Sequence, residues 1–208
     1  MTEPWLERWQ AGRIGWHEDH GNASLKKYWQ GNGRTVLVPL CGKSVDLRWI
    51  AEQGNRVVGV ELSRIAVEAF FDEQGIGYST SEDQLPRYDA EGIDITIYCG
   101  DFFELANLRC DAHFDRGALI AVPPDMRPAY AAHVDSLLVD DAEQLIITVD
   151  YDDQVASGPP FPVGQRELLG YWPDLECVEQ RDDTGNAPPK FLEAGLKEFT
   201  EIVWRSRR

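Results

Sequence analysis

The sequence lacks paired cysteines, which would mark a zinc site or a secreted disulfide framework. Its four cysteines, Cys41, Cys99, Cys110 and Cys177, are scattered along the chain and form no CxxC pair. Neither a structural metal site nor a set of disulfides is expected from such spacing. Reduced thiols in a cytoplasmic protein are the simpler interpretation.

Positive charge is also scarce. The chain has 20 Lys and Arg residues against 36 Asp and Glu residues, which gives a formal net charge of −16. Proteins that bind nucleic acids neutralise phosphates with clustered basic side chains, and the only short basic run here is Arg205–Arg208. The composition therefore favours a small-molecule partner over DNA or RNA.

Long apolar runs are absent as well. No segment approaches the roughly 18 apolar residues that a membrane-spanning helix needs. The first ten residues, MTEPWLERWQ, carry acidic side chains and no apolar stretch of the signal-peptide kind. The sequence predicts no signal peptide and no membrane partner, and its length predicts one domain over residues 1–208.

The stretch TVLVPLCGKSVDLRW, residues 35–49, contains Gly-Lys-Ser but lacks the glycine that a phosphate-binding loop requires. Such a loop has a second glycine five positions earlier, so that several backbone N–H groups can surround the phosphates. That position is Leu37 here, and Pro39 removes one more backbone donor. A nucleoside triphosphatase is therefore disfavoured.

Strand-like and helix-like segments alternate along the chain. Strands are predicted at residues 35–38, 56–62 and 93–99, within 112–122 up to Pro123-Pro124, at 144–150, and late in the chain at 175–180 and 197–205. Helices are predicted at 44–53, from Ser63 to Gly75, and at 126–139, whereas the polar residues 76–92 are interpreted as a connection or insertion. This order predicts an α/β fold with a mostly parallel sheet covered on both faces and an antiparallel strand near the C-terminus.

Ligands of such sheets bind beyond the carboxyl ends of the strands. Glu61 ends the second predicted strand about twenty residues after the glycine loop, where a carboxylate can accept hydrogen bonds from both hydroxyls of a ribose. A dinucleotide needs G-x-G-x-x-G for its pyrophosphate, but Gly42 is the only glycine of this loop. A cofactor without a pyrophosphate, such as S-adenosylmethionine, fits better, while a nicotinamide-dependent reductase remains the alternative enzyme.

Eight collinear blocks give the chain a specific likeness to a known family. They are WLERWQAGRIGWH (5–17), VLVPLCGKSVDLRWIAEQG (36–54), VVGVELSRIAVEAFF (57–71), IYCGDFFEL (97–105), FDRGALIAVPPDMRPAY (114–130), LIITVDYD (145–152), GPPFPV (158–163) and KFLEAGL (190–196). In these blocks the chain resembles the bacterial thiopurine S-methyltransferases, a branch of the class I S-adenosylmethionine-dependent methyltransferases. The resemblance implies a Rossmann-like sheet of about seven strands, with residues 1–30 as a helical lid and 34–208 as the sheet core.

The resemblance also implies the residues of a cofactor site. Trp5 and Trp9 would lie at the cofactor, Leu40 and Gly42 beneath it, Glu61 at its ribose, Asp101 and Phe102 beside its adenine, and Arg116 at its methionine end and the reaction centre. Trp16 stands at the acceptor site, where the family usually has phenylalanine. The indole of Trp16 is larger than a phenyl ring, so the acceptor site keeps an aromatic wall but has a different shape.

Several of these residues have a plainer interpretation. The three N-terminal tryptophans, Trp5, Trp9 and Trp16, are equally consistent with anchoring a helix to the core. Cys41 has no histidine near it in the sequence to activate it as a nucleophile. A thiol acceptor stabilised as thiolate by the permanent charge of Arg116 needs no strong base, although His17, Asp19 and His20 are candidate proton acceptors.

The expected activity is methyl transfer from S-adenosylmethionine to small aromatic or heterocyclic thiols such as thiopurines. The family suggests a second class of acceptor, the oxyanions of selenium or tellurium, whose methylation would be a detoxification. The alternatives are a methyltransferase with a halide or aliphatic thiol acceptor, and a protein that binds S-adenosylmethionine without catalysis. A cytoplasmic monomer is expected.

Overall fold

The computed structural model describes residues 3–206, and these residues divide into two compact units. The first unit comprises the described residues up to Phe114 together with Leu137–Ala142. The second comprises Asp115–Ser136 and the described residues from Glu143 onward. Residues 1, 2, 207 and 208 of the predicted domain lie outside the described residues.

The helices and strands account for most of the described chain. The α-helices are α1 (Glu3–Gln10), α2 (Ala23–Tyr28), α3 (Asp46–Glu52), α4 (Arg64–Gln74), α5 (Arg127–Leu137), α6 (Gln165–Tyr171) and α7 (Pro189–Glu193). The strands are β1 (Thr35–Pro39), β2 (Arg56–Glu61), β3 (Tyr78–Glu82), β4 (Pro86–Ala90), β5 (Ile95–Cys99), β6 (Cys110–Arg116), β7 (Leu138–Asp150), β8 (Leu175–Asp182) and β9 (Thr200–Ser206). Short 3₁₀ helices lie at η1 (Phe102–Glu104), η2 (Leu119–Ala121), η3 (Pro124–Met126) and η4 (Thr184–Asn186).

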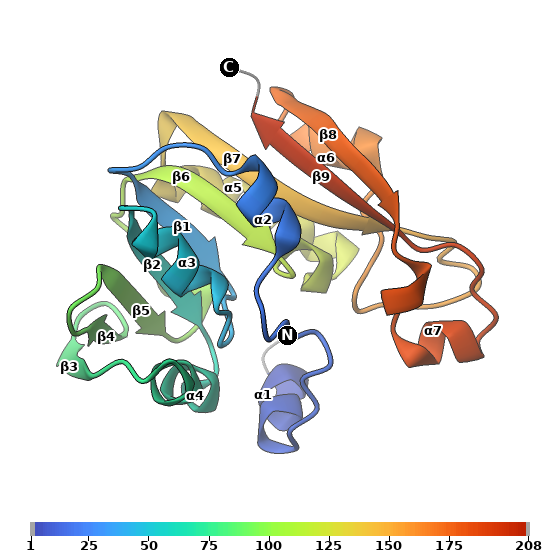
Figure 1. The fold of residues 1–208 in the computed structure, drawn as a ribbon. Helices are drawn as coiled ribbons and strands as arrows, with labels where there is room; N and C mark the ends of the chain where they lie inside the picture. The colour runs from blue at the N-terminus through green and yellow to red at the C-terminus, as the bar shows by residue number, and fades with distance from the viewer. Residues whose placement is uncertain (1–2, 207–208) are drawn as a thin grey trace. The chain divides into compact units, whose positions relative to one another are not determined.

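The first unit contains the parallel strands (Figure 1). Its strand order is β3-β4-β5-β2-β1-β6, and β1 pairs in parallel with β2 and β6, while β2 pairs in parallel with β5. The apolar runs of β1 and β2 are buried, as expected for parallel strands covered on both faces. Since parallel strands end at one edge, the residues that follow β1, β2 and β5 gather there.

The two helices between these strands begin and end where the sequence predicts. The side chain of Ser63 caps α4 by accepting the N–H of Ala66, and Gly75 ends α4 in the left-handed conformation at φ 63°. Helix α3 ends just before Gly54, which also has a positive φ of 84°. Both helices pack against β2 and β5.

Residues 76–92, interpreted as a connection or insertion, contain the hairpin β3–β4, so they are not a plain connection. The two strands pair antiparallel, with Thr80 opposite Tyr88, and β4 continues the sheet by pairing antiparallel with β5. Strand β3 is exposed along most of its length, so its sequence lacks the apolar alternation that marks a strand. Its packing comes instead from aromatic rings, since Tyr78 and Tyr88 both stack near the fully buried Phe71.

The fourth predicted strand exists as β6 but ends at Arg116, earlier than the predicted end at Pro123-Pro124. The cause is the carboxylate of Asp115. Its Oδ1 accepts the N–H groups of Ala118 and Leu119 at 3.2 and 3.1 Å, which turns the chain into η2. The turn passes through Gly117 at a φ of 87°.

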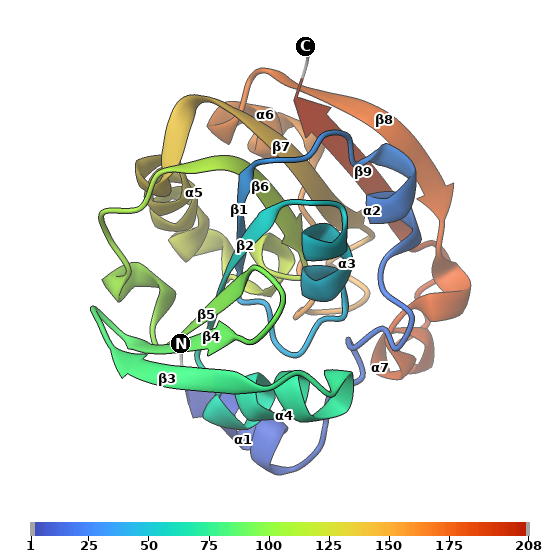
Figure 2. The same cartoon turned by 60° about the vertical axis from the view of Figure 1, so that its left-hand side comes forward.

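The strands of the second unit run antiparallel to one another, in the order β7-β9-β8 (Figure 2). This confirms the antiparallel ending, although β7 begins at Leu138, before the predicted start at Gln144. The last predicted strand, at residues 197–205, exists as β9 at Thr200–Ser206, and four consecutive residues of it, from Glu201 to Trp204, are buried. Helices α6 and α7 were not predicted, since each is too short to show a helical period.

No helix among the described residues is both long and apolar enough to cross a membrane. Within residues 3–206, no group of three or more His, Cys, Asp or Glu side chains is arranged to hold a metal ion.

Candidate functional site

The loop after β1 has an unusual backbone. Leu40 has a φ of 48°, a region that branched side chains rarely adopt, and Gly42 follows at 55°. Between them, the N–H of Cys41 donates to the carbonyl of Val60 on β2 at 3.0 Å. The loop is therefore held against β2, and the left-handed residues turn the chain back towards α3.

The side chain of Glu61 joins this loop to the start of α4. Its Oε2 accepts the N–H of Gly42 at 2.8 Å, and its Oε1 accepts the N–H of Ser63 at 2.7 Å. The carboxyl is buried, and this burial raises its pKa above the ordinary value, while the two backbone donors partly offset the shift. A carboxylate has about four acceptor positions, so each oxygen can still accept one further donor.

Cys41 lies in the same loop but is a packing residue. Its Sγ would be 2.9 Å from a Cβ placed on Gly59, so it fills the space that this glycine leaves on β2. Burial, together with the nearby Glu61, raises the pKa of the Cys41 thiol well above the ordinary value. A thiol of this kind stays protonated at neutral pH, in agreement with the prediction that it is not a nucleophile.

Three tryptophans of the N-terminal segment form one cluster, and one of them contacts the glycine loop. A Cβ on Gly42 would lie 3.2 Å from Cζ2 of Trp9, so the indole covers this glycine. Trp16 meets Trp5 and Trp9 edge to face, with ring centroids 5.2 and 5.9 Å apart. The guanidinium of Arg8 lies 4.8 Å from the centroid of Trp5. The structure therefore brings Trp9 to Gly42 and connects Trp16 to it.

The residues after β5 reach the same edge. The N–H of Gly100 donates to the backbone carbonyl of Glu61 at 2.9 Å. Asp101 caps η1 by accepting the N–H of Phe103 at 3.0 Å, and the ring of Phe102 is buried. Leu40, Gly42, Glu61, Asp101 and Phe102 thus lie at the ends of three neighbouring strands.

Arg116 belongs to the second unit, where it ends β6 in a half-buried position. The residue before it, Asp115, is fully buried and accepts the hydroxyl of Tyr130 at 2.7 Å in addition to two backbone N–H groups. Burial and the neighbouring Asp115 raise the pKa of the Tyr130 hydroxyl well above the ordinary value. No sequence pattern marks Tyr130 as a functional residue, because it lies among the apolar residues of a predicted helix.

The candidate proton acceptors lie in the link between α1 and α2. His17 Nε2 is 3.5 Å from Asp19 Oδ1, and both Asp19 and His20 are exposed. The structure brings His17 and Asp19 together as a pair.

The comparisons with known proteins decide the family. The chain matches the family model described as thiopurine S-methyltransferase over residues 1–208. It is 42% identical over 215 residues to the thiopurine S-methyltransferase of Pseudomonas syringae pv. syringae strain B728a, covering 98% of this chain and 96% of the relative. It is 43% identical over 217 residues to that of Bordetella petrii, covering 100% of this chain and 98% of the relative.

The chain belongs to the thiopurine S-methyltransferase family. It is therefore an S-adenosylmethionine-dependent S-methyltransferase.

Solved structures of low sequence identity share the fold of this family member. A 1,6-didemethyltoxoflavin-N1-methyltransferase of Burkholderia thailandensis, solved with S-adenosylhomocysteine bound, matches with a TM-score of 0.65 at 20% identity, covering 100% of this chain and 87% of that chain. A TehB-like S-adenosylmethionine-dependent methyltransferase of Corynebacterium glutamicum matches with a TM-score of 0.56 at 16% identity, covering 99% and 98%. The predicted class I methyltransferase fold, with a mostly parallel mixed sheet and helices around it, is confirmed.

Proposed function

We propose that this thiopurine S-methyltransferase family member methylates the sulfur of small aromatic or heterocyclic thiols, and that its cofactor binds at the strand ends around Glu61. The observation that carries the proposal is the buried Glu61 carboxylate, which joins the glycine loop to α4 and keeps acceptor capacity on both oxygens. The named relatives of Pseudomonas syringae and Bordetella petrii support the class of acceptor.

The cofactor assignment follows the shape of this edge. Glu61 is a buried carboxylate that already accepts two hydrogen bonds and has two acceptor positions left. These two positions suit the neighbouring hydroxyls of a ribose. Trp9 covers Gly42 and offers an aromatic face, which attracts a sulfonium by cation–π interaction. Leu40 lies in the same loop, while Asp101 and Phe102 follow β5 and flank the adenine in this assignment.

S-adenosylmethionine supplies a methyl group bonded to a positively charged sulfur. The protein's task is then to hold the acceptor sulfur in line behind that methyl group, because orientation of this kind can provide much of the rate acceleration. In this proposal Trp16 forms the aromatic wall of the acceptor site, and Arg116 stabilises a thiolate acceptor or the cofactor carboxylate with its permanent charge. The pair His17–Asp19 is the candidate for taking up a proton from an acceptor that arrives as a thiol.

Other parts of the prediction belong to the same proposal. Residues 1–30 act as a lid over the cofactor, a role consistent with the contact between Trp9 and Gly42. Methylation of selenium or tellurium oxyanions is the second class of acceptor that the resemblance implies, and with it a role in detoxification. A cytoplasmic monomer stays a prediction.

The experiment that tests the proposal measures transfer of a labelled methyl group from S-adenosylmethionine to 6-mercaptopurine. Selenite and an aromatic amine serve as parallel acceptors, and cofactor binding is measured on the same protein by calorimetry. We expect label on the thiol sulfur and none on the amine. Cofactor binding without transfer to any thiol would overturn the proposed acceptor class and favour a protein that binds S-adenosylmethionine without catalysis.

A further inference from the structure

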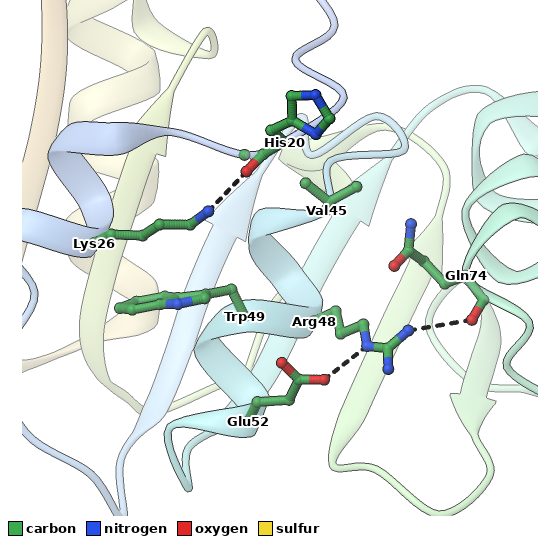
Figure 3. A pocket seen from close by; sticks show the side chains of 8 residues that line it. His20, Lys26, Val45, Arg48, Trp49, Glu52 and Gln74 are labelled. Carbon is green, nitrogen blue, oxygen red and sulfur yellow. Dashed lines mark hydrogen bonds and ion pairs between the residues drawn. The ribbon is translucent and has the colours of Figure 1, made fainter.

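An open hollow of about 320 Å³ lies on the first unit, along one side of α3 (Figure 3). Its lining includes His20 from the link before α2, Lys26 from α2, and Arg48, Trp49 and Glu52 from α3. A second hollow of about 320 Å³ shares Lys26 and Trp49 with the first, so the two are neighbours, and together they are called the groove. Of the residues expected to act in the reaction, only the candidate proton acceptor His20 lines one of the hollows, and none of those expected to bind the cofactor or form the acceptor site does. The volume is in the range of small-molecule sites.

Two cations at this groove keep unused donors. Lys26 donates one hydrogen bond from Nζ, to the carbonyl of His20 at 2.7 Å, which leaves two of its N–H groups for a ligand. Arg48 donates Nε to Glu52 at 2.7 Å and Nη1 to the carbonyl of Gln74 at 3.3 Å. Its Nη2 has no acceptor among the described residues, and Figure 3 shows this end of the guanidinium without a dashed line.

The groove also offers indole rings. Trp49 is half-buried and borders both hollows, so one side chain serves the whole groove. Trp29 lines the second hollow, and its indole Nε1–H is buried without an acceptor among the described residues. Because this N–H is buried, Trp29 contributes ring surface to the hollow and no donor to a ligand.

The charges select the ligand. Lys26 and Arg48 contribute two positive charges and Glu52 one negative charge, which leaves one net positive charge in a chain of net charge −16. A monoanion matches this balance, whereas a phosphate dianion would face repulsion from Glu52. The indole of Trp49 favours a flat aromatic body over an aliphatic one. We propose that this groove is a second ligand site, separate from the strand-end site, and that it binds a planar aromatic monocarboxylate.

The test is calorimetric titration with 2-naphthoate of the full chain, with and without saturating S-adenosylhomocysteine. We expect binding of one 2-naphthoate per chain in both conditions, because the groove does not use the strand-end residues. Acetate, which has the charge without the ring, and 2-naphthalenemethanol, which has the ring without the charge, should each bind at least about tenfold more weakly. Absence of 2-naphthoate binding, or its loss when S-adenosylhomocysteine is present, would overturn the proposal.

Variants locate the binding. Arg48→Gln and Trp49→Leu should each weaken 2-naphthoate binding by about tenfold or more, since they remove the charge and the ring surface. Arg64→Gln is the matched control, because Arg64 forms the same helical ion pair at 2.7 Å, with Glu68 on α4, and lies outside the groove. Each variant is checked for circular dichroism and for calorimetric binding of S-adenosylhomocysteine. Equal 2-naphthoate affinity of the three variants would place the ligand elsewhere and end the proposal. None of these measurements depends on methyl transfer, so they stand or fall apart from the proposed acceptor.

Discussion

The two units of the chain bury a charged side chain in different ways. In the first unit, the carboxylate of Glu61 is held by the backbone N–H groups of Gly42 and Ser63, which belong to the ends of neighbouring elements. In the second unit, the guanidinium of Arg127 is 1% exposed and donates to the carbonyls of Val122 and Pro162 and to the carboxylate of Glu167. The partners of Arg127 lie up to 40 residues away along the chain.

The hydrogen-bond partners of Glu61 lie 2 and 19 residues away, at the ends of neighbouring elements, whereas those of Arg127 lie 5 to 40 residues away. Strand ends and caps fix Glu61, and each of these has a sequence signature. Arg127 instead connects three segments: the end of η2 at Val122, the proline-rich loop at Pro162, and α6 at Glu167. No local sequence pattern predicts such contacts. The second unit should therefore depend more strongly on single buried polar side chains.

The variant Arg127→Met tests whether the second unit depends on its buried guanidinium. It leaves the Val122 and Pro162 carbonyls without their donor, so we expect the free energy of unfolding to fall by about 3–5 kcal/mol. Arg166→Met is the control on α6, because Arg166 is exposed, and it should change stability by less than about 0.5 kcal/mol. Urea denaturation followed by circular dichroism measures both. Equal, small changes would show that the network contributes nothing to the second unit.

The cysteines give the second largest contrast. Burial raises the pKa of Cys99 to about 11 and that of Cys110 to about 12, and the pKa of Cys41 lies well above the ordinary value, whereas Cys177 of the second unit is exposed. At a pH of about 8.5 we expect iodoacetamide to label Cys177 at least about a hundredfold faster than the other three. Mass spectrometry of digested samples measures the rates, and labelling in urea should be similar at all four thiols. If Cys41 is labelled as fast as Cys177, the conclusion that Cys41 is not a nucleophile would be wrong.

The variant Glu61→Ala sharpens the cofactor assignment. Loss of the carboxylate should weaken calorimetric binding of S-adenosylhomocysteine by about 1.5–3 kcal/mol, the range for a hydrogen bond to a charged group. The control is Glu68→Ala on α4. Glu68 is paired with Arg64 and lies outside the strand-end loops. An unchanged affinity of the Glu61 variant would remove the ribose assignment.

The pH dependence of stability tests the same residue. Burial raises the pKa of Glu61 above its ordinary value of 4.5, so the folded state binds a proton more tightly than the unfolded state. The contribution of Glu61 to the free energy of unfolding should therefore fall as the pH rises from about 4.5 through the raised pKa. Subtracting the pH profile of Glu61→Gln from that of the unmodified protein isolates this contribution, and a difference that does not vary with pH would contradict the raised pKa.

A pair of tyrosines provides the smallest test. Tyr130 in the second unit donates to the fully buried Asp115 at 2.7 Å, whereas Tyr98 in the first unit donates to the partly exposed Asp83 at 3.4 Å. Tyr130→Phe should lower the free energy of unfolding by about 1.5 kcal/mol, and Tyr98→Phe by about 0.5 kcal/mol or less. Urea denaturation of both variants measures the difference. A reversed order would contradict the view that the second unit depends more on buried polar contacts.

Much of the first unit could be predicted from the sequence. The strands around residues 35–39 and 56–61 are apolar runs, Ser63 and Gly75 mark the two ends of α4, and Glu61 stands at the expected distance after the glycine loop. The hairpin β3–β4 was missed, because its outer strand is exposed and its packing relies on the aromatic contacts of Tyr78 and Tyr88. Periodicity reports which residues are apolar, and a solvated edge strand needs few of them.

The α/β order of the chain, its antiparallel ending, the family resemblance and the residues that follow each parallel strand could all be predicted from the sequence. Other contacts are visible only in the folded chain. Trp9 covers Gly42, and Asp115 ends β6 and accepts the hydroxyl of Tyr130. Arg127 binds the proline-rich loop before α6. The two groups differ in how far apart along the sequence the interacting residues lie. Strand runs, caps and turns depend on residues within a few positions of one another, whereas these contacts depend on side chains and backbone groups that only the folded chain brings within hydrogen-bond or van der Waals distance.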